Sequence, residues 1–363
     1  MLGSLGQRFR RGVSACLEHQ APAKRRVAWL AAPWERLAEP SRRLELPRGY
    51  DVVGVAGATL GGSGATPVAI ELCRELASRG ARVGYVAHAY GSRVAGAARR
   101  VWPSAEAADE ARLAARQLGC VGVPVFMADK RQAAIDAAAR ELPLGAVLVL
   151  DGALQATPQR FAESVLVVDG EVPWGSGFCP PVGDLRAQRV RLHTADTWLA
   201  MDRGGPIHPE LVGRAQRARR RLTGVRNAQT AERRSLSWLA GRDFQLALAV
   251  ARPERVHEQL LRHAVRARRL STAADHAGLA ALLTPKKSSN VECWVCTEKC
   301  WEATVGRDPA VARRVAGRVW LLEERVELPA QWLEALSARF VEPSRQVRAS
   351  DRFDDSQRTG QGC

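Results

Sequence analysis

A glycine-rich turn, GGSGATP at positions 61–67, contains the residues best suited to bind phosphate. It follows an apolar run, DVVGVAGATL, and precedes VAIELCRELASRG, which has the pattern of a helix. Strand, glycine turn and helix in this order surround a phosphate with backbone N–H groups and a helix N-terminus. The alternative is a tight turn with a helix cap and no ligand. The candidate nucleotide-binding residues are Gly61, Gly62, Ser63, Gly64, Ala65 and Thr66.

The turn differs from the strict phosphate-binding motif at the position where that motif has its charged residue. That motif, G-x-x-x-x-G-K-[ST], contains a lysine that reaches the β- and γ-phosphates. Here Gly64 and Thr66 fit, but Ala65 occupies the lysine position and Thr59 the first glycine position. Loss of one such charged group typically lowers a reaction rate by about 10²–10³. The candidate replacement cations are Lys130, Arg131 and Lys299.

Three further side chains could do chemistry. Asp151 ends an apolar run, where a buried carboxylate needs a partner such as a metal ion. Asp109 opens a predicted helix, where it is either a functional acid or a carboxylate that complements the helix dipole. His276, taken alone, fits a surface histidine as well as a catalytic one.

The segment CWVCTEKC at positions 293–300 has C-x₂-C-x₃-C spacing, which raises the question of a zinc site. Cys293 and Cys296 would point to opposite faces of a regular strand, and a fourth ligand is not evident. Buried, reduced thiols are therefore the preferred interpretation of Cys293, Cys296 and Cys300. The eight cysteines of the chain are scattered, which suits a cytosolic protein better than a disulfide framework.

The elements that must position these residues alternate from residue 51 onwards. Val/Ile/Leu-rich strands separated by helices predict an α/β fold with a mostly parallel sheet covered by helices. Right-handed crossovers bring the carboxyl ends of the strands to one edge, where the glycine turn and Asp151 would meet. Strands are predicted over 51–58, 81–89, 123–128, 146–152, 164–170, 244–251 and 291–298. Helices are predicted over 27–37, 67–78, 108–119, 130–142, 209–222 and 252–265.

The chain of 363 residues is long enough for two modest domains. We expect a basic N-terminal segment at 1–47, a core domain at 48–200, a smaller C-terminal α/β domain at 201–345 and a disordered tail at 346–363.

The charge balance, 54 Lys+Arg against 38 Asp+Glu, gives a formal charge of +16 and favours an anionic partner. Arginine-rich codon usage is the alternative explanation. The arginine run at 213–234 is either a solvated helix face or a contact for lipid head groups. Nucleic acid is not the expected partner, because no aromatic-interleaved or helix-turn-helix pattern accompanies the charge.

No apolar stretch reaches the roughly 18 residues of a membrane span, and no signal peptide is evident. We therefore expect a cytoplasmic protein. Peripheral contact with the anionic inner face of the membrane remains an option, through the N-terminal residues Arg8, Arg10, Arg11, Lys24, Arg25, Arg26, Trp29 and Trp34.

Eight residue groups, in one order, resemble the tetraacyldisaccharide 4'-kinase family, the lipid A 4'-kinases of Gram-negative bacteria. Together they span about residues 50–305. The groups are VGVAGATLGGSGATP (53–67), RVGYVAHAYG (82–91), ADEA (108–111), DGALQA with VVDG (151–170), GSGFCPPVGDLRA (175–187), AVARPERV (249–256), Asp275-His276 and TEKC (297–300).

The resemblance implies a P-loop-NTPase-like core with a smaller α/β domain and transfer of the ATP γ-phosphate to the 4'-hydroxyl of a tetraacyldisaccharide 1-phosphate. ATP and Mg²⁺ would be the cofactors and a glycolipid the partner. On matched positions, Thr66 and Asp151 would hold Mg²⁺, Asp109 would take the hydroxyl proton, and His276 would orient Asp109. Glu110 and the Glu298-Lys299 pair also fall on family motif positions.

The departures from the family pattern concern its charged positions. The N-terminal segment also lacks the apolar membrane-associated helix expected of the family. Three interpretations follow: a kinase of reduced activity, an inactive paralogue that binds lipid or nucleotide, or a P-loop-like protein acting on an unrelated anion. The substituted positions are Ala65 for lysine, Gly152 for the second aspartate, Ala156 for histidine, His88 for arginine and Cys300 for aspartate.

Overall fold

The computed structural model describes residues 44–88, 99–101, 107–153, 161–180, 182–250, 252–273, 278–283 and 291–341. The helix expected at 27–37, the tail expected at 346–363 and the Asp275-His276 pair lie outside these residues. Among the described residues, no helix combines the length and apolar character needed to cross a membrane.

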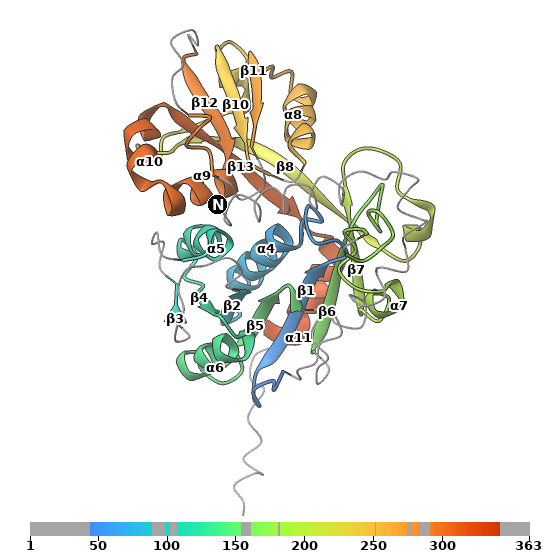
Figure 1. Cartoon of the computed structure of the whole chain (residues 1–363). Helices are drawn as coiled ribbons and strands as arrows, with labels where there is room; N and C mark the ends of the chain where they lie inside the picture. Colours follow the sequence, from blue (N-terminus) through green and yellow to red (C-terminus); the bar gives the residue numbers. More distant parts are fainter. Residues whose placement is uncertain are drawn as a thin grey trace, which may run out of the picture.

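The strands and helices of the described residues alternate along the chain (Figure 1). The strands are β1 (Asp51–Gly57), β2 (Val83–His88), β3 (Arg99–Arg100), β4 (Val125–Ala128), β5 (Val147–Asp151), β6 (Glu163–Asp169), β7 (Thr197–Asp202), β8 (Gln216–Asn227), β9 (Arg233–Arg234), β10 (Phe244–Leu248), β11 (Arg269–Thr272), β12 (Cys293–Thr297) and β13 (Val319–Glu327). The α-helices are α4 (Ala65–Ser78), α5 (Asp109–Gly119), α6 (Arg131–Glu141), α7 (Arg189–Leu192), α8 (Pro253–Arg262), α9 (Glu298–Arg307), α10 (Pro309–Val315) and α11 (Ala330–Val341).

In the described part of the chain, thirteen strands form one sheet. Its order is β11-β10-β12-β13-β8-β7-β6-β1-β5-β2-β4-β3, with β9 paired to β8. The neighbours β7-β6-β1-β5-β2-β4 all pair in parallel, as do β10-β11, β10-β12 and β12-β13. The predicted α/β fold with a mostly parallel sheet is confirmed.

Helices cover both faces of the parallel strands, which explains why these strands are apolar without interruption. Side chains on β5 alternate: Val147 and Val149 lie in the cluster formed with α4, α5 and α11, while Leu148 and Leu150 pack against α6. Strand β1 lies between β5 and β6, so the carboxyl ends of these three strands are adjacent. The turn after β1 is the glycine loop.

Strands β8 and β13 join the two halves of the sheet. They pair antiparallel from Arg219–Asn227 to Trp320–Glu327, and β8 also continues the parallel part through β7. Figure 1 shows β13 running from the C-terminal half into the body that carries α4 and α11. In that C-terminal half, α8 packs on one face and α9 with α10 on the other.

The helix predicted over 209–222 is wrong. A 3₁₀ turn at Pro209–Leu211 precedes the long strand β8, in which Ala218, Leu222 and Val225 are buried. Arginine and leucine have high intrinsic helix propensity, but here the segment pairs with the neighbouring strands β7 and β13. Arg220 and Arg221 form ion pairs with Glu324 and Glu327 of β13 at 2.5 and 2.7 Å.

Candidate active site

The glycine loop adopts a backbone conformation that depends on its glycines. Gly62 and Gly64 have φ of 73° and 91°, in the left-handed region that favours glycine. Gly64 is the N-cap of α4, so the first N–H groups of this helix point towards the loop. A helix N-terminus with such a loop is a site where backbone N–H groups bind phosphate.

A second segment fixes the loop in place. The N–H of Leu60 donates to the carbonyl oxygen of Asp184 at 2.8 Å, and the N–H of Arg186 donates to Ala58 at 2.8 Å. Thr59 and Leu185 form an isolated β-bridge between these two hydrogen bonds. The segment ending in GDLR therefore lies directly against the loop and brings Arg186 to it.

Thr66 and Asp151, the predicted metal pair, are brought together. The Thr66 hydroxyl donates to Oδ2 of Asp151 at 2.7 Å, and the buried Tyr85 hydroxyl donates to the same oxygen at 2.8 Å. Asp151 ends β5 and is 9% exposed. Burial, followed by the charge of Asp151, raises the pKa of Tyr85 well above its usual value. Tyr85 therefore stays protonated and donates to the carboxylate.

These oxygens fit the metal that the resemblance implies. Mg²⁺ in phosphoryl-transfer sites is held by one or two protein oxygens together with phosphate oxygens and water. A hydroxyl on the first turn of a helix and a carboxylate at the end of the adjacent strand form such a pair. Because Thr66 already lies at hydrogen-bond distance from Asp151, both side chains can serve one ion.

Two arginines flank the position of the family's second aspartate. Arg131 donates to the carbonyl oxygens of Asp151 and Gly152 at 2.9 and 2.7 Å. A Cβ atom at Gly152 would lie 3.2 Å from Arg131 and 3.7 Å from Arg186. Burial lowers the pKa of Arg131 to about 10, although the charge of Asp151 opposes this shift. Positive charge therefore surrounds Gly152, where the family has a carboxylate.

Sequence reasoning named Arg131 as a replacement cation but missed Arg186 and Tyr85. Arg186 ends the GSGFCPPVGDLRA group, so the motif itself held that signal. Tyr85 lies inside the apolar run of β2, where a buried hydroxyl resembles any other core residue. Of the other candidate cations, Lys130 is the N-cap of α6, and Lys299 lies 3.4 Å from Glu110.

Asp109 is the first residue of α5, and its carboxylate accepts the N–H of Glu110 at 3.0 Å. The charge of Glu110 counteracts part of the lowering that burial imposes on the pKa of Arg186. The charges of Asp151 and of Glu110 therefore both act on the arginine beside the glycine loop. His276, its expected companion, lies outside the described residues.

The cysteines of β12 alternate as expected for a regular strand. Cys293 belongs to the core cluster with α8, and Cys296 belongs to the cluster with α9 and α10 on the opposite face. Cys300, in the first turn of α9, accepts the N–H of Ala249 at 3.2 Å. Cys296 and Cys300 thus share one core cluster, whereas Cys293 packs on the opposite face of the strand.

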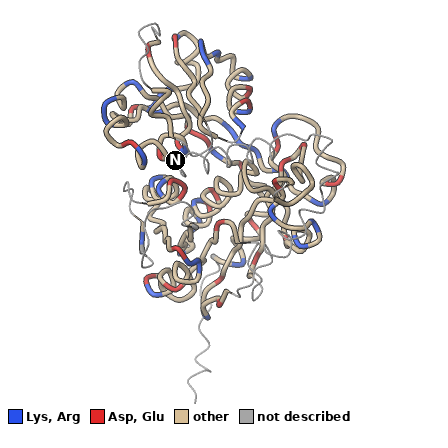
Figure 2. Tube along the Cα trace, viewed as in Figure 1, with Lys and Arg blue, Asp and Glu red and all other residues tan. Residues whose placement is uncertain are grey.

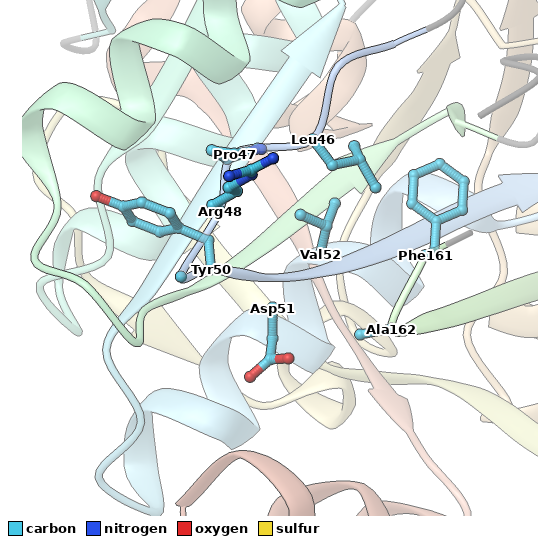
Figure 3. A pocket seen from close by; sticks show the side chains of 9 residues that line it. Leu46, Pro47, Arg48, Tyr50, Asp51, Val52, Phe161 and Ala162 are labelled. Atoms are coloured by element: carbon cyan, nitrogen blue, oxygen red, sulfur yellow. The ribbon is translucent and has the colours of Figure 1, made fainter. Parts of the chain in front are cut away.

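A cavity of about 360 Å³ lies at the amino ends of β1 and β6, opposite the carboxyl ends that carry the glycine loop (Figure 3). It is lined by residues that lead into β1, among them Tyr50 and Asp51, and by Phe161 and Ala162 before β6. The glycine loop follows the far end of β1, and a seven-residue strand spans roughly 20 Å. This cavity is therefore separate from the phosphate-binding loop.

Comparisons with known proteins agree with this arrangement. A family model for the tetraacyldisaccharide-1-P 4'-kinase LpxK matches residues 31–341. The tetraacyldisaccharide 4'-kinase of Anaeromyxobacter dehalogenans (strain 2CP-1 / ATCC BAA-258) is 32% identical over 334 residues, covering 85% of each chain. That of Thiobacillus denitrificans (strain ATCC 25259 / T1) is 32% identical over 291 residues, covering 74% of this chain and 84% of the relative.

The fold is also that of a solved structure, LpxK from Aquifex aeolicus in complex with ATP. The two share a TM-score of 0.62 and 17% identity, over 86% of this chain and 99% of the other. Because the family model covers most of the chain and the relatives are similar along it, this protein belongs to the tetraacyldisaccharide 4'-kinase family.

Proposed function

We propose that this protein transfers the γ-phosphate of ATP to the 4'-hydroxyl of a tetraacyldisaccharide 1-phosphate. Membership of the family gives the reaction class: an ATP-dependent, Mg²⁺-using kinase of lipid A biosynthesis. The observation that carries the proposal to this chain is the 2.7 Å hydrogen bond between Thr66 and Asp151 beside the glycine loop. That contact joins the two residues that would hold the metal.

The chain's own residues would divide the work as follows. Backbone N–H groups of the loop and of the first turn of α4 bind the phosphates. Thr66 and Asp151 would hold Mg²⁺, which would neutralise phosphate charge, and Tyr85 keeps the carboxylate of Asp151 in place. Arg131 and Arg186 direct positive charge to the same place, where charge on the transferred group needs stabilisation.

The acceptor hydroxyl needs a group that takes its proton. We assign this role to Asp109, at the N-terminus of α5, with His276 as the residue that orients it. Support comes from the matched family motifs and from the ion pair at 3.4 Å between the neighbouring Glu110 and Lys299, two further matched positions. General-base catalysis of this kind contributes roughly 10²–10⁴ in rate.

The hypothesis of an inactive paralogue rests on the substituted charged positions alone. The relatives described above carry the name of the kinase, and the Thr66–Asp151 pair is kept. We therefore propose an active enzyme.

We further propose that the enzyme works at the cytoplasmic side of the membrane, with peripheral contact to anionic lipid. Its proposed acceptor is a lipid, and the chain carries a formal charge of +16. Figure 2 shows Lys and Arg spread over many helices and loops, with acidic residues interspersed. A net positive charge of this size attracts the protein to an anionic membrane surface.

The test is transfer of ³²P from Mg-ATP to tetraacyldisaccharide 1-phosphate by the wild type, Asp109→Ala and Asp136→Ala. We expect measurable transfer by the wild type and a loss of about 10²–10⁴ in kcat for Asp109→Ala. Asp136→Ala is the matched control, because it removes an exposed carboxylate from α6. A folded wild type that transfers no phosphate, even with Ala65→Lys, would overturn the proposal.

A further inference from the structure

Three arginines gather around one buried carboxylate at the end of β6. Asp169 has a side chain that is 5% exposed, and its Oδ2 forms ion pairs with Arg255 at 2.9 Å and with Arg252 at 3.4 Å. Arg203, which follows β7, contacts the same oxygen. Arg252 also lies 3.7 Å from Asp184, in the segment that fixes the glycine loop.

Two of these arginines lie against the glycine loop itself. A Cβ atom at Gly62 would be 3.7 Å from Cδ and Nε of Arg252 and 3.7 Å from Nη1 of Arg255. Arg255 also points Nη1 at the carbonyl oxygen of Gly62, at 3.4 Å. Gly62 is three residues before Ala65, so both guanidinium groups come from outside the loop to the segment that lacks its lysine.

The cluster carries more positive than negative charge. In these direct ion pairs, three guanidinium groups share the two carboxylates of Asp169 and Asp184. Burial lowers the pKa of Arg203, the charges of Asp169 and Glu171 oppose this shift, and the like charge of Arg252 adds to it. Among these five directly paired side chains, one guanidinium charge is in excess, beside the segment in which Ala65 occupies the lysine position.

Guanidinium groups suit such a role. An arginine presents several N–H donors in a fixed plane and binds phosphate oxygens in pairs, whereas lysine offers a single compact charge. The side chains of Arg252 and Arg255 are 22% and 25% exposed, so solvent and ligands can reach them. If Arg252 and Arg255 moved towards a phosphate, Asp169 would still have partners. These are Arg203 and the backbone N–H groups of Glu171 and Val172.

We propose that Arg252 and Arg255 supply the phosphates of ATP with the positive charge that the loop lacks at Ala65. This inference rests on the proposed function, because it requires ATP to bind in the glycine loop. Arg252 immediately precedes α8 and Arg255 lies in its first turn, within the C-terminal half of the chain. Nucleotide binding would therefore depend on both halves of the sheet.

The experiment measures the Kd of Mg-ATP by calorimetry, together with phosphoryl transfer, for the full-length protein. The variants are Arg252→Gln/Arg255→Gln, the same pair combined with Ala65→Lys, and Arg269→Gln. The last is the control, because Arg269 is exposed on β11, away from the loop. Thermal unfolding of each variant confirms that it is folded.

We expect the double variant to bind Mg-ATP about 10- to 100-fold more weakly, since it loses two charge-assisted contacts. Ala65→Lys should restore binding to within about threefold of the wild type, because a lysine on the loop replaces the charge from α8. Arg269→Gln should bind as the wild type does. A folded double variant with unchanged affinity, or one that Ala65→Lys does not rescue, overturns the inference.

The two readouts separate this inference from the kinase function. A wild type that binds Mg-ATP through Arg252 and Arg255 but transfers no phosphate supports the inference and contradicts the proposed function. If the wild type transfers phosphate normally and the double variant keeps its ATP affinity, the proposed function is supported and this inference is contradicted. A wild type that does not bind Mg-ATP overturns both.

Discussion

At the scale of single residues, the site depends on how Asp151 is held. Two hydroxyl groups, from Thr66 and Tyr85, donate to one of its oxygens at 2.7 and 2.8 Å. Thr66 lies on the first turn of α4, whereas Tyr85 belongs to the buried strand β2. If Thr66 turns its hydroxyl towards a metal, Tyr85 remains to keep the carboxylate oriented, as partners of metal ligands commonly do.

This arrangement predicts graded effects on the Mg²⁺ requirement. Asp151→Asn should lower kcat by at least about 10², because it removes the charge at the metal. Tyr85→Phe should raise the Mg²⁺ concentration for half-maximal activity by about 10-fold, since a lost partner of a metal ligand typically costs 10–100-fold. Mg²⁺ activation curves at saturating ATP measure both kcat and the Mg²⁺ concentration for half-maximal activity.

Tyr50→Phe is the matched control for Tyr85→Phe. The Tyr50 hydroxyl donates to Ala139 and Leu142 at 2.6 and 2.8 Å, at the opposite edge of the sheet. Its loss should leave the Mg²⁺ requirement unchanged. If the wild type, Tyr85→Phe and Tyr50→Phe give the same Mg²⁺ activation curve, Tyr85 does not position Asp151.

At the scale of elements, the helix that carries Asp109 is fixed by a buried group of charges. Glu302 of α9 is fully buried and pairs with Arg112 and Arg116 of α5 at 3.1 and 2.7 Å. Arg112, itself 2% exposed, also donates to Ala107 at 2.5 Å. The same contact region places Lys299 3.4 Å from Glu110. Helices α5 and α9 therefore act as one unit at the junction of the two halves.

Glu302→Gln should lower the free energy of unfolding by about 3–5 kcal/mol, because it leaves the buried guanidinium of Arg112 without a compensating charge. Urea unfolding followed by circular dichroism measures the change. Glu334→Gln, an exposed position on α11, should change it by less than about 0.5 kcal/mol. Matching midpoints for the two variants would mean that the buried pair does not hold α5 to α9.

The sequence alone predicted the elements whose pattern is local. Strands β1, β5 and β6 are continuous apolar runs with glycine nearby, and the structure places each within about two residues of its predicted bounds. The strand β8 could not be predicted this way, because its arginines become a strand only beside the glutamates of β13. Tyr85 was missed for the same reason, because a tertiary contact brings it to Asp151. Arg252 lies in the matched AVARPERV group, but its place against the glycine loop depends on the tertiary fold.

At the scale of the whole molecule, charge is compensated unevenly. Most arginines of the 213–234 run form ion pairs, so this run contributes little uncompensated charge to the surface. The pairs are Arg219–Asp202, Arg220–Glu324, Arg221–Glu327, Arg226–Glu298, Arg226–Glu323, Arg233–Glu323 and Arg234–Glu232. The interpretation of that run as a basic helix for lipid head groups therefore loses its support. The N-terminal basic residues become the stronger candidates for membrane contact.

Neutralising those residues should weaken binding to anionic vesicles far more than neutralising other arginines. The change is Arg8, Arg10, Arg11, Lys24, Arg25 and Arg26 to Gln, assayed by co-sedimentation with vesicles rich in phosphatidylserine. Each basic residue near such a surface contributes about 1 kcal/mol, so the bound fraction should fall to the level seen with neutral vesicles. Binding of the wild type should also fall as salt rises from 0.05 to 0.5 M, because the Debye length shortens from about 14 to about 4 Å.

The control removes the same number of charges from exposed positions elsewhere on the molecule. It changes Arg82, Arg140, Arg266, Arg269, Arg313 and Arg314 to Gln. If total charge alone determined binding, the two sextuple variants would bind vesicles equally weakly, and the proposed role of the N-terminal segment would be wrong. If the segment provides the contact, only the N-terminal variant loses binding. Kinase activity towards a detergent-dispersed acceptor should stay intact in both, because neither set includes a residue of the proposed site.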